Sequence, residues 1–164
     1  MASDTPAPYC SEGFKQALLG WQHLNRWSQQ DPHEFAKAAG SPGPHNSQWS
    51  RAVRGLLDPK AGFFLGLEIF NLALASGEIP GTIPTTNRER LVGSQPLRTD
   101  DGRILTAADF FALYVGQLPC PEMVRHAATQ AAERPPASVI KAAAVLENLS
   151  PTERQQLAAL LASG

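Results

Sequence analysis

Apolar residues recur near the start of the chain at the three- and four-residue spacings of an amphipathic helix. Phe14, Leu18, Trp21 and Leu24 form the first such set. Because residues at these spacings lie on one side of a helix, they predict a helix with one buried face. Residues 1–10 carry two prolines and lack this periodicity, so we expect a flexible leader there.

A second and a third helix are predicted from their start and stop signals. In the segment Asp31-Pro32-His33-Glu34, an Asp cap, a Pro at the first helical position and a Glu three residues after the cap indicate a helix start. This helix ends at Gly40, because the prolines that follow cannot continue it. The next helix begins at Asn46 or Ser47, either of which is a suitable cap, and runs to Arg54.

A fourth helix is predicted to start at Asp58-Pro59, an Asp cap followed by Pro, with Gly77 as its end. Residues 78–95 are rich in Pro, Gly and Thr, and we interpret residues 79–95 as a linker between two domains. The first domain then spans residues 11–78. The fourth helix offers one apolar face to the core of this domain, made of Phe63, Leu67, Phe70 and Leu74.

The second half, residues 96–164, is predicted to be a smaller helical domain. Asp100-Asp101-Gly102 between two short apolar-containing arms predicts a short β-hairpin. Helix starts follow at Thr106, near Pro121 and Pro136, and at the capping box that begins with Ser150. The fold class is therefore mainly α, with four or five helices in the first bundle, and the second domain is expected to dimerise or to bind a partner.

Charge and composition restrict the function further. The net charge is −1, with 14 basic and 15 acidic side chains, which argues against a protein that coats nucleic acid through charge alone. No apolar run approaches the length of a membrane span, and the N-terminus has no secretory signal pattern. Two widely separated cysteines give no disulfide framework. We therefore expect a cytoplasmic protein with no membrane contact.

Candidate catalytic and metal-binding patterns are weak. The four histidines have no metal-ligand spacing, which predicts no metal site and no cofactor. Cys120 and His126 are six positions apart, so on one helix they face different sides and do not form a nucleophile–base pair. Asp100 and Asp101 are typical turn formers. We expect no catalytic residues and no enzyme activity.

The strongest functional signal is the predicted helix over residues 46–54. If Trp49, Ala52 and Val53 point inward, its outer face carries cationic, amide and hydroxyl groups and no carboxylate. Arg pairs well with guanine, Gln or Asn with adenine, and Ser with either. Trp49 is expected to be buried against Phe35 or Phe63. The predicted DNA-contacting residues are His45, Asn46, Ser47, Gln48, Ser50, Arg51, Arg54 and Lys60, with His45 and Lys60 on phosphate.

These segments resemble a known family. Residues 35–40, residues 47–55 and Asp58-Pro59 are similar, in order and spacing, to the lambda-repressor-like (XRE-type) helix-turn-helix family, and the resemblance covers residues 14–77. It implies a sequence-specific transcriptional regulator whose third helix enters the major groove of double-stranded DNA as part of a homodimer.

The chain departs from the family pattern in two ways. The turn over residues 41–45 is longer than usual, and Trp49 and Val53 replace residue types that are usual at their positions. Two alternatives therefore stay open. One is a protein–protein interaction module, in a bacterial or phage assembly, that keeps the helix-turn-helix fold. The other is a plain solvated surface bearing two arginines.

Overall fold

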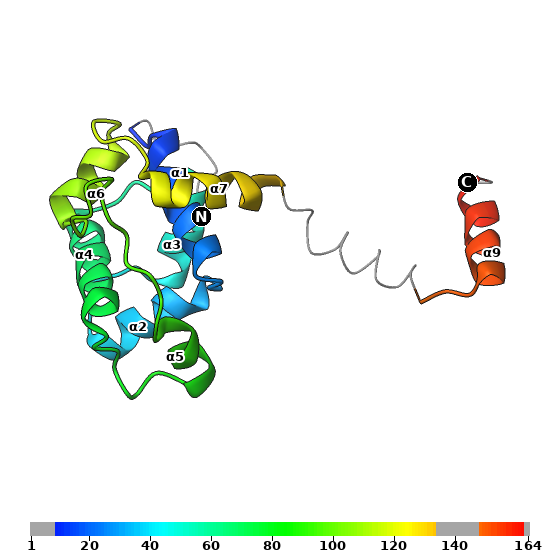
Figure 1. Cartoon of the computed structure of the whole chain (residues 1–164), viewed down its shortest axis with the longest axis horizontal. Helices are drawn as coiled ribbons and strands as arrows, with labels where there is room; N and C mark the ends of the chain where they lie inside the picture. Colours follow the sequence, from blue (N-terminus) through cyan, green and yellow to red (C-terminus); the bar gives the residue numbers. More distant parts are fainter. Residues whose placement is uncertain (1–8, 134–147, 163–164) are drawn as a thin grey trace. The chain divides into compact units, whose positions relative to one another are not determined.

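The computed structural model describes residues 9–133 and 148–162, and within these ranges it contains eight α-helices and no strand. The mainly α fold class is confirmed. No helix in the described ranges is long and apolar enough to span a bilayer. The helices, labelled in Figure 1, are α1 (Glu12–Leu24), α2 (Gln30–Ala39), α3 (Asn46–Val53), α4 (Ala61–Ser76), α5 (Thr85–Leu91), α6 (Ala107–Tyr114), α7 (Glu122–Glu133) and α9 (Pro151–Ala162).

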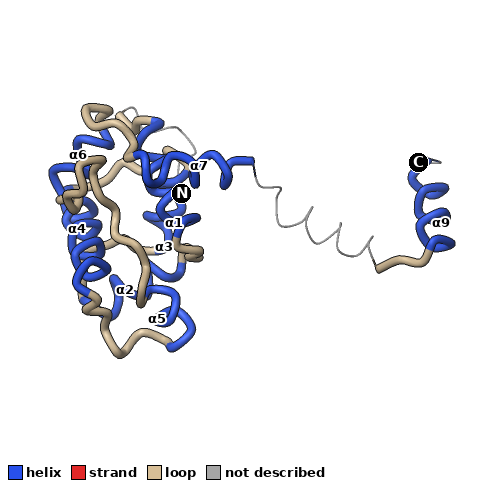
Figure 2. The backbone as a smooth tube through the Cα atoms, viewed as in Figure 1, coloured by secondary structure: helices blue, strands red, loops and turns tan. Residues whose placement is uncertain are grey.

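The chain divides into two compact units, with the division between Ala132 and Glu133. In the first unit, α4 packs on α6, and α1 packs on both α3 and α6. The helix α2 contacts α3, α4 and α5. The tube in Figure 2 shows how loops and short helices alternate in this unit. The helices therefore enclose one common interior.

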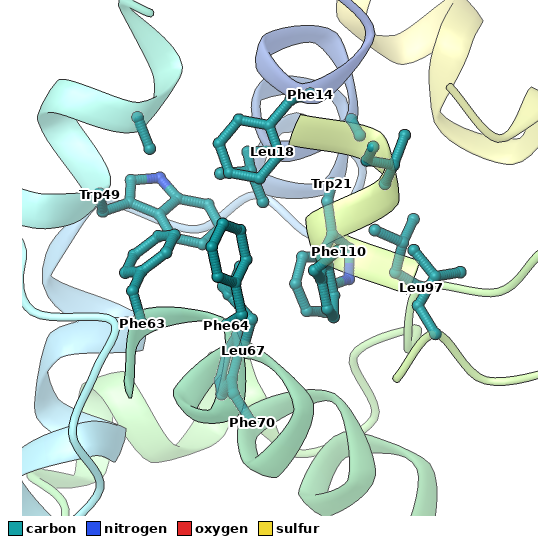
Figure 3. Close-up of a cluster of buried hydrophobic side chains, with 14 of the residues drawn as sticks. Phe14, Leu18, Trp21, Trp49, Phe63, Phe64, Leu67, Phe70, Leu97 and Phe110 are labelled. Carbon is teal, nitrogen blue, oxygen red and sulfur yellow. The ribbon is translucent and has the colours of Figure 1, made fainter. Parts of the chain in front are cut away.

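That interior is a single hydrophobic core, rich in aromatic rings. Figure 3 shows side chains of α1, α3, α4 and α6 converging on it. Trp21 lies at its centre: its ring is 5.4 Å from that of Phe70 and 6.1 Å from that of Phe110, measured between centroids. The predicted apolar face of the first helix is confirmed for Phe14, Leu18 and Trp21, which are fully buried, while Leu24 is only partly buried.

The expected linker over residues 79–95 differs from what the structure contains. Ile79, Ile83 and Leu91 are buried in the same core as residues of α1 and α6, and α5 forms within the segment. The segment looks like a linker in sequence because Pro and Gly interrupt its apolar residues. Those isolated residues still fill positions in the shared core, so the segment does not separate two domains.

The start of α2 also differs from the expectation that Asp31 is its cap. The helix begins at Gln30, and Asp31 is completely buried within its first turn. One Asp31 oxygen accepts from Ser28 N–H at 2.9 Å, and the other accepts from the Asn87 side chain at 2.8 Å. The guanidinium of Arg90 donates to both oxygens, at 2.9 and 3.0 Å. Asp31 therefore joins α2 to α5.

The segment 97–105 forms a turn with one isolated antiparallel bridge, between Arg98 and Ile104, in place of paired strands. The predicted helix start that follows is confirmed, since Thr106 and Asp109 form a reciprocal capping box at α6. In the second unit, the Ser150 hydroxyl accepts from Glu153 N–H at 3.2 Å at the start of α9, as its capping box predicts. The helix start predicted near Pro136 lies outside the described residues.

Candidate nucleic-acid interface

A buried turn joins α2 to α3. The helix α2 ends as predicted at Gly40, whose φ of 64° is in the left-handed region that glycine adopts without strain. The Ser41 hydroxyl then donates to Gly43 O at 2.7 Å. A side chain at Gly66 of α4 would collide with the Gly43 backbone, so the turn rests directly on α4. The longer turn is thereby fixed against the core.

The start of α3 is held by side chains from its own first turn and from α2. His45 is the capping residue, one position before the expected Asn46 or Ser47. Gln48 Oε1 accepts from His45 N–H at 2.8 Å, and Asn46 N–H donates to His33 Nδ1 at 3.2 Å. The first N–H groups of a helix have no backbone acceptor within the helix, so these two side chains accept the hydrogen bonds instead.

Trp49 fixes α3 on the core, and its predicted burial is confirmed. The side chain is fully buried, and its indole N–H donates to Gln22 Oε1 in α1 at 2.6 Å. Its ring neighbours are Trp21 and Trp27, with centroids 6.2 and 6.4 Å away. Ala52 is fully buried as well, so the inner face of α3 is the one that the sequence predicts.

The opposite face of α3 reaches solvent and carries no carboxylate. Ser47 and Arg54 are exposed, and Asn46 and Ser50 are partly exposed. Arg54 Nε donates to Ser50 O at 3.2 Å, which keeps the guanidinium close to the helix surface. Lys60, also exposed, is the capping residue of α4, two positions after the predicted cap at Asp58. This face therefore presents hydroxyl, amide and cationic groups together.

Two of the predicted contact residues are engaged inside the protein. Arg51 Nη2 donates to Leu56 O at 2.9 Å, and Leu56 N–H donates back to Arg51 O at the same distance. Arg51 therefore holds the connection from α3 to α4. Gln48 is partly exposed, but its amide oxygen is bound to His45 N–H. In this conformation, neither polar group projects freely from α3.

Asn46 is distinctive in another way. Its Oδ1 is buried and lacks a hydrogen-bond partner among the described residues.

Sequence reasoning missed the roles of His33 and Gln22, because each supports α3 from a different helix. Their spacing along the chain carries no signal for a contact that forms only when α1, α2 and α3 pack together.

A groove lies beside this face, between the buried turn and the start of α4. Its floor is apolar, while Gln48, Asp58 and Lys60 bring polar and charged groups to it. The Asp58 carboxylate makes the groove less cationic than the face of α3 itself. The lining residues are Pro42, Gln48, Leu57, Asp58, Pro59, Lys60, Gly62 and Phe63.

Chemistry for a metal or a reactive nucleophile is sparse in the described ranges. No group of three or more His, Cys, Asp or Glu side chains there is arranged to hold a metal ion. Burial raises the pKa of the Cys120 thiol, and Arg125 opposes this shift only in part. Burial likewise raises the pKa of Cys10. Both cysteines are therefore thiols at neutral pH, the less nucleophilic form.

Comparison with known proteins places the chain in a family but gives no relative of known activity. No curated protein matches it, and no solved structure matches it. A family model described as a domain of unknown function (DUF8644) matches residues 9–116, which is more than half of the chain. The matched range takes in α1 to α6 and thus the whole α2–turn–α3 region. The chain therefore belongs to the DUF8644 family.

Proposed function

We propose that this chain is a sequence-specific DNA-binding transcriptional regulator and that α3 enters the major groove. The observation that carries the proposal is the two-sided character of α3. Its inner face is anchored by Trp49, and its outer face offers Asn46, Ser47, Ser50 and Arg54 with no carboxylate among the residues of the helix. A rigid helix with short polar side chains and local cations suits contact with base edges and phosphates.

The proposal extends to the arrangement of the first unit. We interpret α1 to α5 as a lambda-repressor-like bundle in which α2 and α3 are the helix-turn-helix pair. The support is the contact of α3 with both α1 and α2, together with the fixed turn between them. In this arrangement α2 lies across the DNA backbone, and α3 lies in the groove. We assign phosphate contact to His45, which precedes α3, and to Lys60, which precedes α4.

We further propose a homodimer that acts in the cytoplasm without a cofactor and without catalysis. Helix-turn-helix dimers bind two half-sites about one helical turn of DNA apart, so the dimer doubles a contact surface that is small in one copy. The net charge of −1 does not favour DNA binding, so in this proposal affinity depends on a few local cations and on base contacts.

The proposal is tested by selection of binding sites from a random duplex library with the full-length protein. We expect enrichment of a two-fold symmetric sequence, and we expect affinity to fall steeply between low and physiological salt. A Ser47→Ala and Ser50→Ala double variant should lose sequence preference, whereas Thr86→Ala in α5 should not. Failure of the parent protein to enrich any sequence at low salt would contradict the proposal.

A second candidate function is a non-enzymatic protein–protein interaction module. The observation that favours it is a set of exposed apolar side chains on α4 and α6: Leu65, Leu72 and Phe111 are about half exposed, at 47%, 51% and 52%. Leu65 and Leu72 are two turns apart and so share a face of α4. Because α4 and α6 pack on each other, we infer that these side chains contribute to one contact surface, as contiguous apolar patches do.

The two candidates respond differently to a single change. Phe111→Glu places a charge on the apolar surface of α6 and leaves α3 untouched. If this surface is the functional site, the variant loses its protein partner, and salt has little effect on binding by the parent. If α3 is the site, the variant retains DNA affinity within the error of the titration.

A further inference from the structure

Two histidine rings meet where α2 joins α3. The ring of His33, in α2, packs edge-on against that of His45, with centroids 5.7 Å apart and planes at 68°. Both residues are partly buried. His33 Nδ1 accepts the bond from Asn46 N–H, the first amide of α3, at 3.2 Å. One imidazole therefore supports the start of the helix that carries the proposed site.

This bond requires a neutral His33 ring. An imidazole nitrogen accepts a hydrogen bond only when it carries no proton, so the proton must reside on Nε2. Protonation converts Nδ1 into a donor that faces a second donor, the Asn46 N–H, and the bond is lost. Histidine is the side chain that changes charge between about pH 5 and 8.

The charged groups around the two rings come from four helices. Within residues 9–133 and 148–162, no carboxylate forms an ion pair with His33 or His45. Asp31, the buried carboxylate of α2, is already bound to Arg90. The charged residues on α2 and on the helices packed against it are Asp31, Glu34 and Lys37 on α2, Arg51 on α3, Glu68 on α4, and Arg88, Glu89 and Arg90 on α5.

Two further features define the electrostatic surroundings of the rings. The N-terminus of α3 is the positive end of its dipole, and it lies beside both rings. If both rings were charged, two cations would also be held at a ring separation of 5.7 Å. The bond from Asn46 N–H to His33 Nδ1 therefore requires an unprotonated Nδ1 on the His33 ring.

We propose that the α2–α3 junction is a proton-sensitive switch in which neutral His33 holds the first turn of α3 and protonated His33 releases it. The switch acts on the position of Asn46 and Ser47, the first two residues of the proposed DNA-reading helix. Its consequence for DNA rests on the function proposed above. The switch itself is a property of the folded protein, and it is tested without DNA.

The test is amide hydrogen exchange of the full-length, isotope-labelled protein, measured by NMR at pH 8 and pH 5. After correction for the intrinsic pH dependence of exchange, protection of the Asn46 amide should fall about tenfold at the lower pH, the effect of losing one hydrogen bond. In the spectrum of the His33 ring nitrogens at pH 8, Nδ1 should carry no proton.

The matched variant is His33→Asn. An Asn side chain offers a neutral acceptor near the position of Nδ1 and does not titrate, so protection of the Asn46 amide should become equal at the two pH values. The control, His23→Asn in α1, makes the same change away from the junction and should keep the pH dependence.

Three results would overturn the switch. They are equal protection of Asn46 at both pH values in the parent protein, a pH dependence that survives His33→Asn, or a proton on His33 Nδ1 at pH 8. The last result is measured on the unaltered protein, so it tests the switch even if the His33→Asn variant fails to fold.

Discussion

Arg90 and Asp31 are 59 residues apart in the chain, and the Arg90 guanidinium donates hydrogen bonds to both carboxylate oxygens of Asp31. The Asp31 side chain is completely buried, while that of Arg90 is 36% exposed. The side-chain bond to Asp31 is the main reason that the pKa of Arg90 is raised. This pair fixes α5, and with it the segment after α4, on the first turn of α2.

Removal of the carboxylate should therefore loosen α5 from α2. We expect Asp31→Ala to lower the free energy of unfolding by about 2–4 kcal/mol, since it breaks a buried ion pair and its associated hydrogen bonds. Urea denaturation measures the change. Glu34→Ala on the same helix is the control and should change stability by less than about 0.5 kcal/mol. Equal effects of the two substitutions would contradict this role.

Trp49 offers a test of how α3 is anchored. Trp49→Ala should destabilise the protein by about 3–5 kcal/mol, because it leaves a large cavity between α1 and α3. Trp49→Phe keeps most of the apolar volume but removes the bond to Gln22, so its cost should be smaller. Thermal unfolding of both variants, beside Ser47→Ala as an exposed control, measures this order. Similar costs for Ala and Phe would mean that packing contributes little.

Asp109 provides a prediction about pH. Its bond to Arg103 is the main cause that lowers the pKa of the carboxyl to about 2, with further help from the backbone and hydroxyl of Thr106. A carboxyl group in the unfolded chain titrates near pH 3.9. The folded pKa is the lower one, so this group stabilises the fold above about pH 4, and that contribution is lost as the pH falls through about 2.

The measurement is an NMR titration of the Asp109 carboxyl group. Arg103→Ala should raise its pKa toward the ordinary value, because the two-pronged contact at 2.5 and 2.9 Å is removed. Arg98→Ala, which removes a neighbouring exposed guanidinium, should leave the titration unchanged. An unchanged pKa in the Arg103 variant would contradict the assignment.

Arg54 separates phosphate contact from base contact within the proposed interface. Because it is exposed at the end of α3, Arg54→Ala should weaken DNA binding for all sequences alike and reduce the salt slope by about one. Arg88→Ala on α5 is the control with the same loss of charge. Fluorescence anisotropy over a salt series gives both quantities. A loss confined to one preferred sequence would instead assign Arg54 to base reading.

The second unit is predicted to contribute to the homodimer through α9. Leu160 is 70% exposed on this helix, and burial of such a side chain against a second copy would stabilise association. Leu160→Glu should therefore lower the average mass in sedimentation velocity at tens of micromolar. Gln155→Glu adds the same charge on the same helix and should not. A parent protein that sediments as a monomer would contradict the prediction.

Local chemistry in the sequence determined much of the secondary structure. The spacing of Phe14, Leu18, Trp21 and Leu24 predicted a buried face, and all but the partly buried Leu24 are fully buried. Gly40 and Gly77 end helices because they adopt left-handed backbone angles without strain. Thr106 and Ser150 begin helices through bonds to residues three positions later. Each of these signals depends on a few neighbouring residues, so the sequence alone suffices to identify it.

Tertiary packing decided what each polar side chain does. Asp31 matches a helix cap in sequence, yet it is bound to Arg90 from another helix. Arg51 points outward by periodicity, yet its guanidinium bends back to Leu56 O. The sequence of residues 79–95 predicts a linker, yet its few apolar residues are buried in the core. Long side chains form hydrogen bonds with groups that only folding brings within reach. Spacing along the sequence therefore cannot determine which partner each of them has.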